Sequence, residues 1–381
     1  MAGPGGRFLQ RQEPGRGRDA RTFGGTPSPP WPRGDKNPAA AATPELGLVA
    51  IETDTGLIGH AFLGASFRSA RLDVLSLTRH LKSAVIGQDP LERERLWQAL
   101  SKRIRATTYR AIGAIDVALW DIAGKAANLP IHQLLGTCRR KVPAYVSSSV
   151  LASHEAYLEQ ASAMRDRGFR AYKIHPPTGL DATIRLCRAL RDLLGPDYRL
   201  MIDPAGAFSY PDALRLGRVL EELDFYWYED PLAEDDAYNY VKLRQKLDIP
   251  LMATEYSPGG FHAYAPWITA QATDYLRGDV AIKGGLTAIL KGAHLAEAFR
   301  MNYEIHHGGN SLNNFANLHV MMAIGNCEYF EVLLPERAQK YAIINDIEVD
   351  SEGYVHAVDS PGLGAQIDFD LIKRNTTEVL R

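Results

Sequence analysis

Three acidic residues recur at an even interval in the middle of the chain, and each directly follows a short apolar run. Glu229 lies 26 residues after Asp203, and Glu255 lies 26 residues after Glu229. The runs are apolar and rich in aromatic or β-branched residues, which is typical of buried parallel strands. A helical pattern follows each run, as in a strand-helix unit. If these units close into a barrel, the acids share the end where barrel enzymes carry their sites.

The same alternation continues along the chain and predicts eight strands, which favours a closed TIM-like α/β barrel over an open sheet. An open doubly wound sheet usually has a glycine-rich phosphate loop after its first strand, and residues 146–150 are not such a loop. The predicted strands are 142–148, 169–175, 198–203, 225–230, 250–255, 274–280, 302–307 and 328–334.

The chain of 381 residues is long enough for a barrel and an accessory domain. Residues 46–62 predict a β-hairpin with its turn at Gly56. Residues 1–38 are rich in glycine, proline and arginine without a hydrophobic period, so we expect them to be disordered or to form an extended arm. The remaining predicted elements are helices at 67–86, 89–103 and 107–127, and hairpin-like segments at 347–350 and 354–358 that return to the N-terminal α+β domain.

Composition excludes several classes of protein. A net charge of -2 gives no field for nucleic acid or an anionic membrane, and 45% hydrophobic residues indicate an ordinary soluble globular protein. Cys138, Cys187 and Cys327 are few and far apart, so neither a disulfide framework nor a zinc cluster is expected. No apolar run reaches the roughly 18 residues of a membrane helix. We therefore expect a cytoplasmic protein.

Side chains at the predicted strand ends indicate a magnesium-dependent carbon-acid reaction. Three converging carboxylates need a cation to stay ionised, and oxygen ligands of this kind suit Mg²⁺. A divalent ion that chelates a substrate carboxylate helps to stabilise the enediolate left when the α-proton is removed. The other candidates are Lys173 as an electrostatic helper, His175 as a base, a His306–Asp279 dyad as base on the other face, and Glu331 on the eighth strand, with Glu328 as its competitor.

The set resembles the enolase superfamily, specifically the mandelate racemase/muconate lactonizing enzyme-like family and its mandelate racemase subgroup. The resemblance covers about residues 45–365. It is carried by Asp203-Pro, Glu229-Asp-Pro, Thr254-Glu255, Lys173-x-His175, Asp279 with Lys283-Gly-Gly, His306, Ala114-Ile-Asp-Val-Ala-Leu-Trp-Asp and Gln133-Leu-Leu-Gly.

The resemblance implies a (β/α)₇β barrel at 141–335 under an α+β capping domain formed by 39–140 and 336–381. It also implies one Mg²⁺ held by Asp203, Glu229 and Glu255, an enediolate intermediate, and a homo-oligomer.

Three features depart from the family pattern. His175 stands where the second lysine of Lys-x-Lys is usual, and it is either a base or a ligand for a substrate hydroxyl. Lys283 comes one place later than is common, and strand alternation would put it on the same face as Asp279. Residues 1–38 do not resemble the usual first strand of the cap, so we expect that element to be missing or replaced.

Several polar residues have a simpler interpretation. We expect Asp116 and Asp121 to pack or cap helices, His307 to be a loop or substrate contact, and Glu331 to support the dyad or bind substrate. Residues 234–236 are expected to begin a helix with caps, and His262 is given no role.

Dehydration of a sugar acid, an aldonate or aldarate, to a 2-keto-3-deoxy acid is the leading functional prediction. The polar segment 306–314 suits a polyhydroxylated substrate, and protonated His306 could assist departure of the 3-hydroxyl. The alternatives are racemisation or epimerisation of a 2-hydroxy acid, with His175 opposite His306, and a metal-binding barrel that is inactive because its cap is altered.

Overall fold

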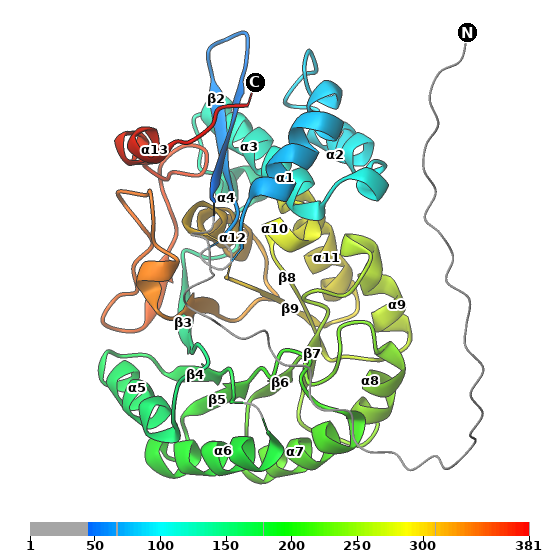
Figure 1. Ribbon diagram of the computed structural model, residues 1–381, viewed down its shortest axis with the longest axis vertical. Helices are drawn as coiled ribbons and strands as arrows, with labels where there is room; N and C mark the ends of the chain where they lie inside the picture. Colours follow the sequence, from blue (N-terminus) through cyan, green and yellow to red (C-terminus); the bar gives the residue numbers. More distant parts are fainter. Residues whose placement is uncertain (1–44, 66–67, 178, 309, 381) are drawn as a thin grey trace, which may run out of the picture. The chain divides into compact units, whose positions relative to one another are not determined.

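The computed structural model describes residues 45–65, 68–177, 179–308 and 310–380 (Figure 1). The predicted arm at 1–38 and the first residues of the predicted cap, 39–44, lie outside the described residues. Within the described ranges, no helix combines the length and the apolar character needed to cross a membrane.

The N-terminal part is a small α+β unit built on a hairpin. Strands β1 and β2 pair antiparallel, and Gly56 takes a φ of +82° in the turn between them, as the sequence predicted. The elements of this part are β1 Gly47–Glu52, β2 Ile58–Leu63, α1 Arg71–Ser76, η1 Leu77–Leu81, η2 Lys82–Ala84, α2 Arg93–Ser101, η3 Ile104–Ala106, α3 Tyr109–Ala127 and α4 Ile131–Leu135.

Helix α3 joins this unit to the barrel. It begins where the Thr108 side chain accepts a hydrogen bond from the Ala111 amide. Its glycine face allows close approach, because a Cβ on Gly113 would lie 2.4 Å from the Val280 carbonyl oxygen. Asp116 accepts two hydrogen bonds from Thr287, and Asp121 accepts one from the His60 amide. The predicted packing role of these two acids is confirmed.

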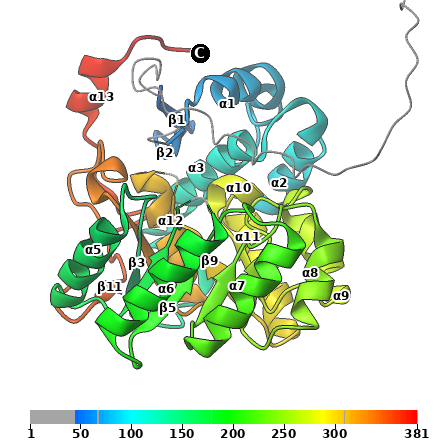
Figure 2. The same ribbon diagram turned by 60° about the horizontal axis from the view of Figure 1, so that its bottom comes forward.

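Eight parallel strands form a nearly closed barrel in the order β10-β3-β4-β5-β6-β7-β8-β9 (Figures 1 and 2). Each predicted strand is present. At the seam between β9 and β10, the Tyr303 amide donates to the Asn326 carbonyl. The strands are β3 Lys141–Ser147, β4 Ala171–Ile174, β5 Arg199–Ile202, β6 Trp227–Glu229, β7 Leu251–Ala253, β8 Tyr275–Gly278, β9 Asn302–Ile305 and β10 Phe330–Leu333.

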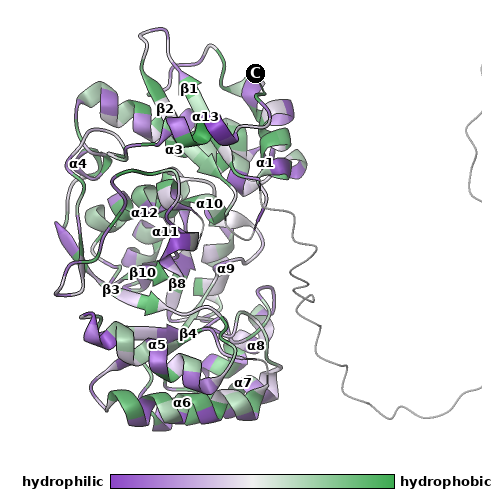
Figure 3. Ribbon diagram, turned by 60° about the vertical axis from the view of Figure 1, so that its left-hand side comes forward, coloured by the Kyte–Doolittle hydropathy of each residue, from purple (hydrophilic) through white to green (hydrophobic). Residues whose placement is uncertain are grey.

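Helices follow the strands and cover the outside of the barrel (Figure 2). In α6, Leu186, Leu190 and Leu194 recur every four residues and are buried, while polar residues are mixed along the rest of the helix (Figure 3). The helical elements are α5 His154–Asp166, α6 Leu180–Leu194, α7 Tyr210–Glu222, α8 Ala237–Arg244, η4 Gly260–Ala263, α9 Tyr264–Thr269, α10 Val280–Lys283, α11 Leu286–Ala298 and α12 Ser311–Ala323. As predicted, Asp236 caps α8 by accepting from the Asn239 amide.

The C-terminal segment, which contains η5 Glu336–Ala338, β11 Tyr354–His356 and α13 Phe369–Asn375, differs from the prediction. Strand β11 pairs antiparallel with barrel strand β3, and residues 347–350 form no strand. Residues 354–356 therefore depart from the prediction that 354–358 joins the N-terminal unit, because the start of β3 offers them a barrel partner. The end of the segment does reach that unit, since the Val358 carbonyl lies 3.0 Å from His132 Nε2 of α4. The Leu363 amide also reaches it and donates to Asp121.

Candidate active site

Strand alternation separates the barrel interior into an apolar layer and a polar layer. Met201 and Trp227 are buried in a cluster that fills the interior. Two residues further along the same strands, Asp203 and Glu229 point to the same side but lie beyond the cluster, at the carboxyl ends of the strands. The apolar layer closes the barrel below the polar groups, so these groups are largely shielded from water.

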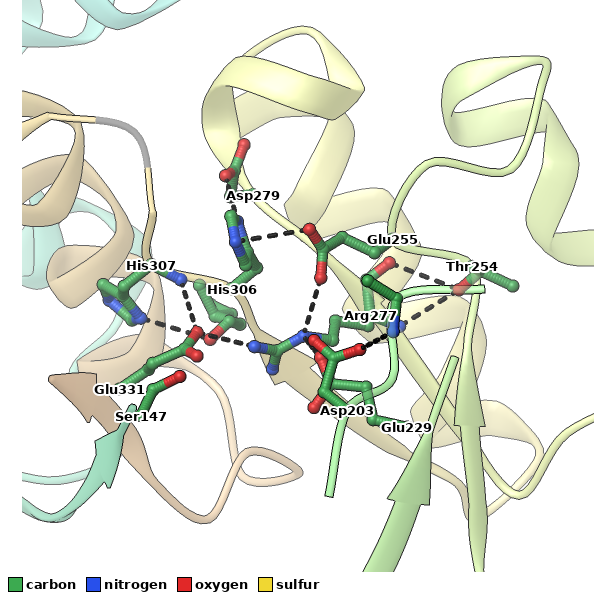
Figure 4. Close-up of polar contacts among 12 residues, drawn as sticks. Ser147, Asp203, Glu229, Thr254, Glu255, Arg277, Asp279, His306, His307 and Glu331 are labelled. Carbon is green, nitrogen blue, oxygen red and sulfur yellow. Dashed lines mark hydrogen bonds and ion pairs between the residues drawn. The ribbon is translucent and has the colours of Figure 1, made fainter. Parts of the chain in front are cut away.

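Asp203, Glu229 and Glu255 converge as the sequence predicted. Each is buried, and each offers one oxygen that lies within 4.8 Å of the others (Figure 4). Thr254 has a φ of +85°, a strained value for a β-branched residue. Its hydroxyl donates to the Arg277 carbonyl and accepts from the Arg277 amide, which holds the backbone that carries Glu255.

This cluster suits a divalent cation. The Nε–H of Arg277 is directed at Glu255 Oε2. Glu229 Oε1 lies 2.5 Å from the same nitrogen but not in the direction of this N–H, so it has no hydrogen-bond donor among the described residues. Burial raises the pKa of Glu229 to about 7, although Arg277 and Lys173 act against it. A buried acceptor without a donor and a carboxylate that resists ionisation both call for further positive charge.

Lys173 lies beside the cluster as predicted. Its ammonium is buried and contacts Glu229 Oε2 at 2.9 Å and Glu331 Oε1 at 2.8 Å. Burial would lower the pKa of Lys173, but these carboxylates raise it well above its ordinary value. The lysine is therefore a fixed positive charge at the floor of the site.

Arg277 is a central residue that the sequence analysis missed. Its side chain is fully buried and contacts Glu229 and Glu255 through Nε and Glu331 through Nη2, at 2.5, 3.3 and 2.6 Å (Figure 4). The signal was present in the sequence, because Arg277 precedes Asp279 by two residues in an otherwise apolar strand and so shares its face.

The structure separates Glu331 from its competitor Glu328. Glu331 is buried between Lys173 and Arg277 and accepts from the His307 amide at 2.9 Å. Burial would raise its pKa, but the two cations lower it well below the ordinary range. Glu328 lies outside this group and contacts Arg199 and Tyr226. Glu331 is thus an ionised carboxylate that ties the floor of the site to the segment carrying His306.

His306 and Asp279 form the predicted dyad. His306 Nδ1 lies 2.6 Å from Asp279 Oδ2, and His306 Nε2 lies 3.3 Å from Glu255 Oε1. Asp279 also accepts from the Ile282 amide, which starts α10. Burial would lower the pKa of His306, but the Glu255 and Asp279 carboxylates raise it to about 9. The dyad therefore holds a basic imidazole beside the acidic cluster.

His175 approaches the cluster on the Asp203 side. Its Nδ1 lies 2.5 Å from the Ser148 carbonyl, so this nitrogen must carry a proton. Its Nε2 lies 3.0 Å from Asp203 Oδ2. Burial would lower the pKa of His175, but Asp203 raises it. The two imidazoles therefore each direct Nε2 at a different member of the acidic cluster.

Two further buried residues, His307 and Lys283, lie in surroundings that do not indicate a catalytic role. Burial lowers the pKa of His307 to about 3, and its ring lies against the tilted ring of Phe330 with 4.1 Å between their centres, so it stays neutral. Lys283 is buried, and its Nζ has no hydrogen-bond partner among the described residues. Strand β8 ends at Gly278 and Lys283 lies on α10, so the strand alternation that was expected to put Lys283 on the face of Asp279 does not apply there. Burial lowers its pKa to about 8.

A pocket of about 470 Å³, part of it open to solvent, lies between the N-terminal unit and the barrel. Asp279 and His306 line it from the barrel side, and Asn313 from the start of α12. Arg68 and Arg110 line it from the N-terminal unit. The dyad is therefore reached through a space whose other wall comes from the N-terminal unit.

Residues 156–371 match the family described as enolase C-terminal domain-like. Residues 38–136 match the mandelate racemase / muconate lactonizing enzyme N-terminal domain. The first match covers more than half of the chain and contains the acidic cluster, Arg277 and the dyad. The chain belongs to the enolase superfamily. It is an enzyme with the superfamily's barrel and, in its N-terminal unit, the superfamily's cap.

Relatives of this chain include enzymes named for acid sugars and for a sugar lactone. The arabinonate dehydratase of Saccharolobus solfataricus is 27% identical in an alignment 340 residues long that covers 85% of this chain and 88% of that protein. The D-galactarolactone cycloisomerase of Agrobacterium fabrum is 30% identical in an alignment 345 residues long that covers 85% of this chain and 89% of that protein. A D-glucarate dehydratase from Agrobacterium tumefaciens, solved with magnesium, is 36% identical with a TM-score of 0.81, covering 87% and 91% of the two chains.

Proposed function

We propose that this member of the enolase superfamily is a magnesium-dependent dehydratase of an acid sugar, an aldonate or aldarate, and that it forms a 2-keto-3-deoxy acid. The observation that carries the proposal is the contact of His306 Nε2 with Glu255, 3.3 Å away, while Nδ1 is held by Asp279. This contact sets an acid-base group directly beside the acidic cluster.

Asp203, Glu229 and Glu255 would hold Mg²⁺ through one oxygen each. The bound ion would supply positive charge next to a substrate carboxylate, which lowers the cost of removing the α-proton. Lys173 adds its buried ammonium to this field, and Arg277 keeps the carboxylates apart and oriented.

The two histidines would carry the protons. A base takes the proton from C2, and the electron pair moves into the C1–C2 bond to give the enediolate. The pair then forms the C2–C3 double bond as the C3–O bond breaks. Protonated His306 gives its Nε2 proton to the departing hydroxyl, which leaves as water, and the enol product becomes the 2-keto-3-deoxy acid. Asp279 keeps the Nδ1 proton in place, so Nε2 is the nitrogen that exchanges protons. His175, with Nδ1 bound to the Ser148 carbonyl, is proposed as the base or as a ligand for a substrate hydroxyl.

The test is a screen of the purified protein with Mg²⁺ against aldonates and aldarates, read by the absorbance of the semicarbazone of the product. Each active substrate is repeated in D₂O by proton NMR with His306→Asn and His175→Asn variants. Formation of a keto acid that disappears in His306→Asn supports the proposal. If no substrate yields a keto acid, the dehydratase assignment is wrong.

Racemisation or epimerisation of a 2-hydroxy acid is the second candidate. It is favoured by one observation, that His175 and His306 face two different members of the acidic cluster. Exchange of the α-proton in D₂O without keto acid would support it. A metal-binding barrel without turnover would bind Mg²⁺ and an acid sugar and show neither signal.

A further inference from the structure

Two arginines of the cap meet at one tyrosine of the barrel. The Arg68 guanidinium lies 5.8 Å from the centre of the Tyr256 ring, and the Arg110 guanidinium lies 5.9 Å from it. Arg68 follows the β1–β2 hairpin, Arg110 is in the first turn of α3, and Tyr256 follows the cluster member Glu255. Segments far apart in the chain thus bring two positive charges to one wall of the pocket that contains His306.

Neither guanidinium has a hydrogen bond or an ion pair with any residue in the part of the chain that the structure describes. Both side chains are half-buried. The guanidinium charges act on the pKa of two carboxylates, Asp279 and Glu234, but neither of these carboxylates pairs with Arg68 or Arg110. Asp279, whose pKa is lowered against burial chiefly by His306 and more weakly by Arg110, is bonded to that histidine. Glu234 is exposed at the surface.

Two cations against one ring repel each other, and a shared anion removes that repulsion. A guanidinium presents two parallel N–H groups that match the two oxygens of a carboxylate. The face of the aromatic ring attracts the cations but carries no negative charge that could neutralise them. The wall formed by Arg68, Arg110 and Tyr256 is therefore suited to a carboxylate.

We infer that the substrate is an aldarate, a sugar acid with a carboxylate at each end. One carboxylate lies at the acidic cluster with its cation, and the second lies between Arg68 and Arg110. An aldonate has a neutral hydroxymethyl group at the second end and leaves both guanidiniums unpaired. This inference rests on the proposed function, because it assumes that an acid sugar occupies the pocket.

The experiment compares matched pairs that differ only at the second end, glucarate with gluconate and galactarate with galactonate, in the presence of Mg²⁺. Binding is measured by calorimetry in the His306→Asn variant, and turnover by keto-acid formation in the unaltered enzyme. We expect the preferred aldarate to bind at least tenfold more tightly than its aldonate, as for hydrogen bonds to charged groups. Equal or tighter binding of the aldonates overturns the inference. Tighter aldarate binding without turnover leaves it standing and removes the dehydratase assignment instead.

Substitution of the two arginines tests where the second carboxylate of the aldarate binds. Arg68→Met and Arg110→Met should each weaken aldarate binding about 10- to 100-fold and change aldonate binding less than about threefold. Arg71→Met is the control, because among the described residues that exposed arginine pairs only with Glu45, also exposed; this variant should leave the binding of both substrates unchanged. A loss of equal size for both substrates overturns the inference, since it would mean general damage to the pocket. A phosphate-ended aldonate that binds more tightly than every aldarate also overturns it.

Discussion

The imidazole of His306 is tied through Nδ1 to Asp279 Oδ2 at 2.6 Å, across the ends of two neighbouring barrel strands. The carboxylate accepts a hydrogen bond from the Nδ1–H group, so neutral His306 has its lone pair on Nε2, which faces Glu255. Strand register brings the pair together, because Gly278 and Ile305, the residues just before them, are paired partners. This relationship makes the dyad a single acid-base unit.

His306→Asn should lower the rate of dehydration by about 10²- to 10⁴-fold, the range typical of a lost general acid or base. Asp279→Asn should lower it by a smaller factor, because the amide still occupies the site and Glu255, which raises the pKa of His306 most, remains, although the charge of Asp279 is lost. Keto-acid formation under saturating substrate measures both. Calorimetric titration with Mg²⁺ serves as the control and should be little changed in either variant. An active His306→Asn enzyme would exclude the dyad from the chemistry.

Mg²⁺ should stabilise the folded chain. An ion that binds only the native state at 100 times its Kd adds about 2.7 kcal/mol to the free energy of unfolding. Asp203→Asn should remove most of this gain and abolish turnover, because it takes one of three carboxylates from the cluster. Thermal unfolding with and without a chelator measures the effect. Equal stabilisation of the variant and the unaltered chain would place the ion elsewhere.

Arg277→Met should destabilise the protein by about 3–5 kcal/mol, because it leaves buried carboxylates without their shared cation. Arg188→Met is the matched control. That arginine pairs with Glu222 at the surface, with both side chains at least half exposed, and we expect a change of less than about 1 kcal/mol. Urea unfolding of both variants provides the comparison. Similar losses in the two would argue against Arg277 as the organiser of the cluster.

Gly285→Ala should be far more destabilising than Gly56→Ala. Gly285 has φ +106° and ψ 177°, a region reached almost only by glycine, and an added Cβ would lie 2.2 Å from Asp116 Oδ2. At Gly56 the φ is also positive, but a Cβ would meet nothing within 4 Å. We expect roughly 1–2 kcal/mol at Gly56 from backbone strain alone and a clearly larger loss at Gly285. Equal losses in chemical unfolding would show that the α3–α11 contact can shift.

Lys283 should make stability rise with pH. Burial lowers its pKa from 10.5 to about 8. Between these values the folded lysine has lost its proton while the unfolded lysine keeps it, so unfolding takes up a proton and becomes harder as pH increases. Below about pH 8 the buried charge destabilises the fold, and Lys283→Met should be the more stable protein there.

The difference in unfolding free energy between Lys283→Met and the unaltered chain should shrink from pH 7.5 to pH 10. The measurement is made with chelator present, so that no metal charge acts on the lysine. A difference that stays constant with pH would mean that Lys283 keeps its ordinary titration.

The sequence by itself determined the barrel, its eight strands and the three metal-ligand candidates, because these depend on local properties. Alternation within a strand decides which face a residue occupies. The even length of the strand-helix units places the ends of neighbouring strands side by side at one end of the barrel. For the same reason Lys173, Asp279 and His306 could be assigned from their strand-end positions. The resemblance to the enolase superfamily came from the same residues.

Only the tertiary structure decided which groups touch. Arg277 becomes the centre of the acidic cluster, and the candidate Glu331, not its competitor Glu328, joins that cluster, through distances set by packing across the barrel. Strand β11 pairs with β3 because an open stretch of that strand lies within its reach. Arg68 and Arg110 meet at Tyr256 because the cap closes on the barrel. Periodicity specifies faces along one element, whereas contacts between distant elements depend on how all of them pack together.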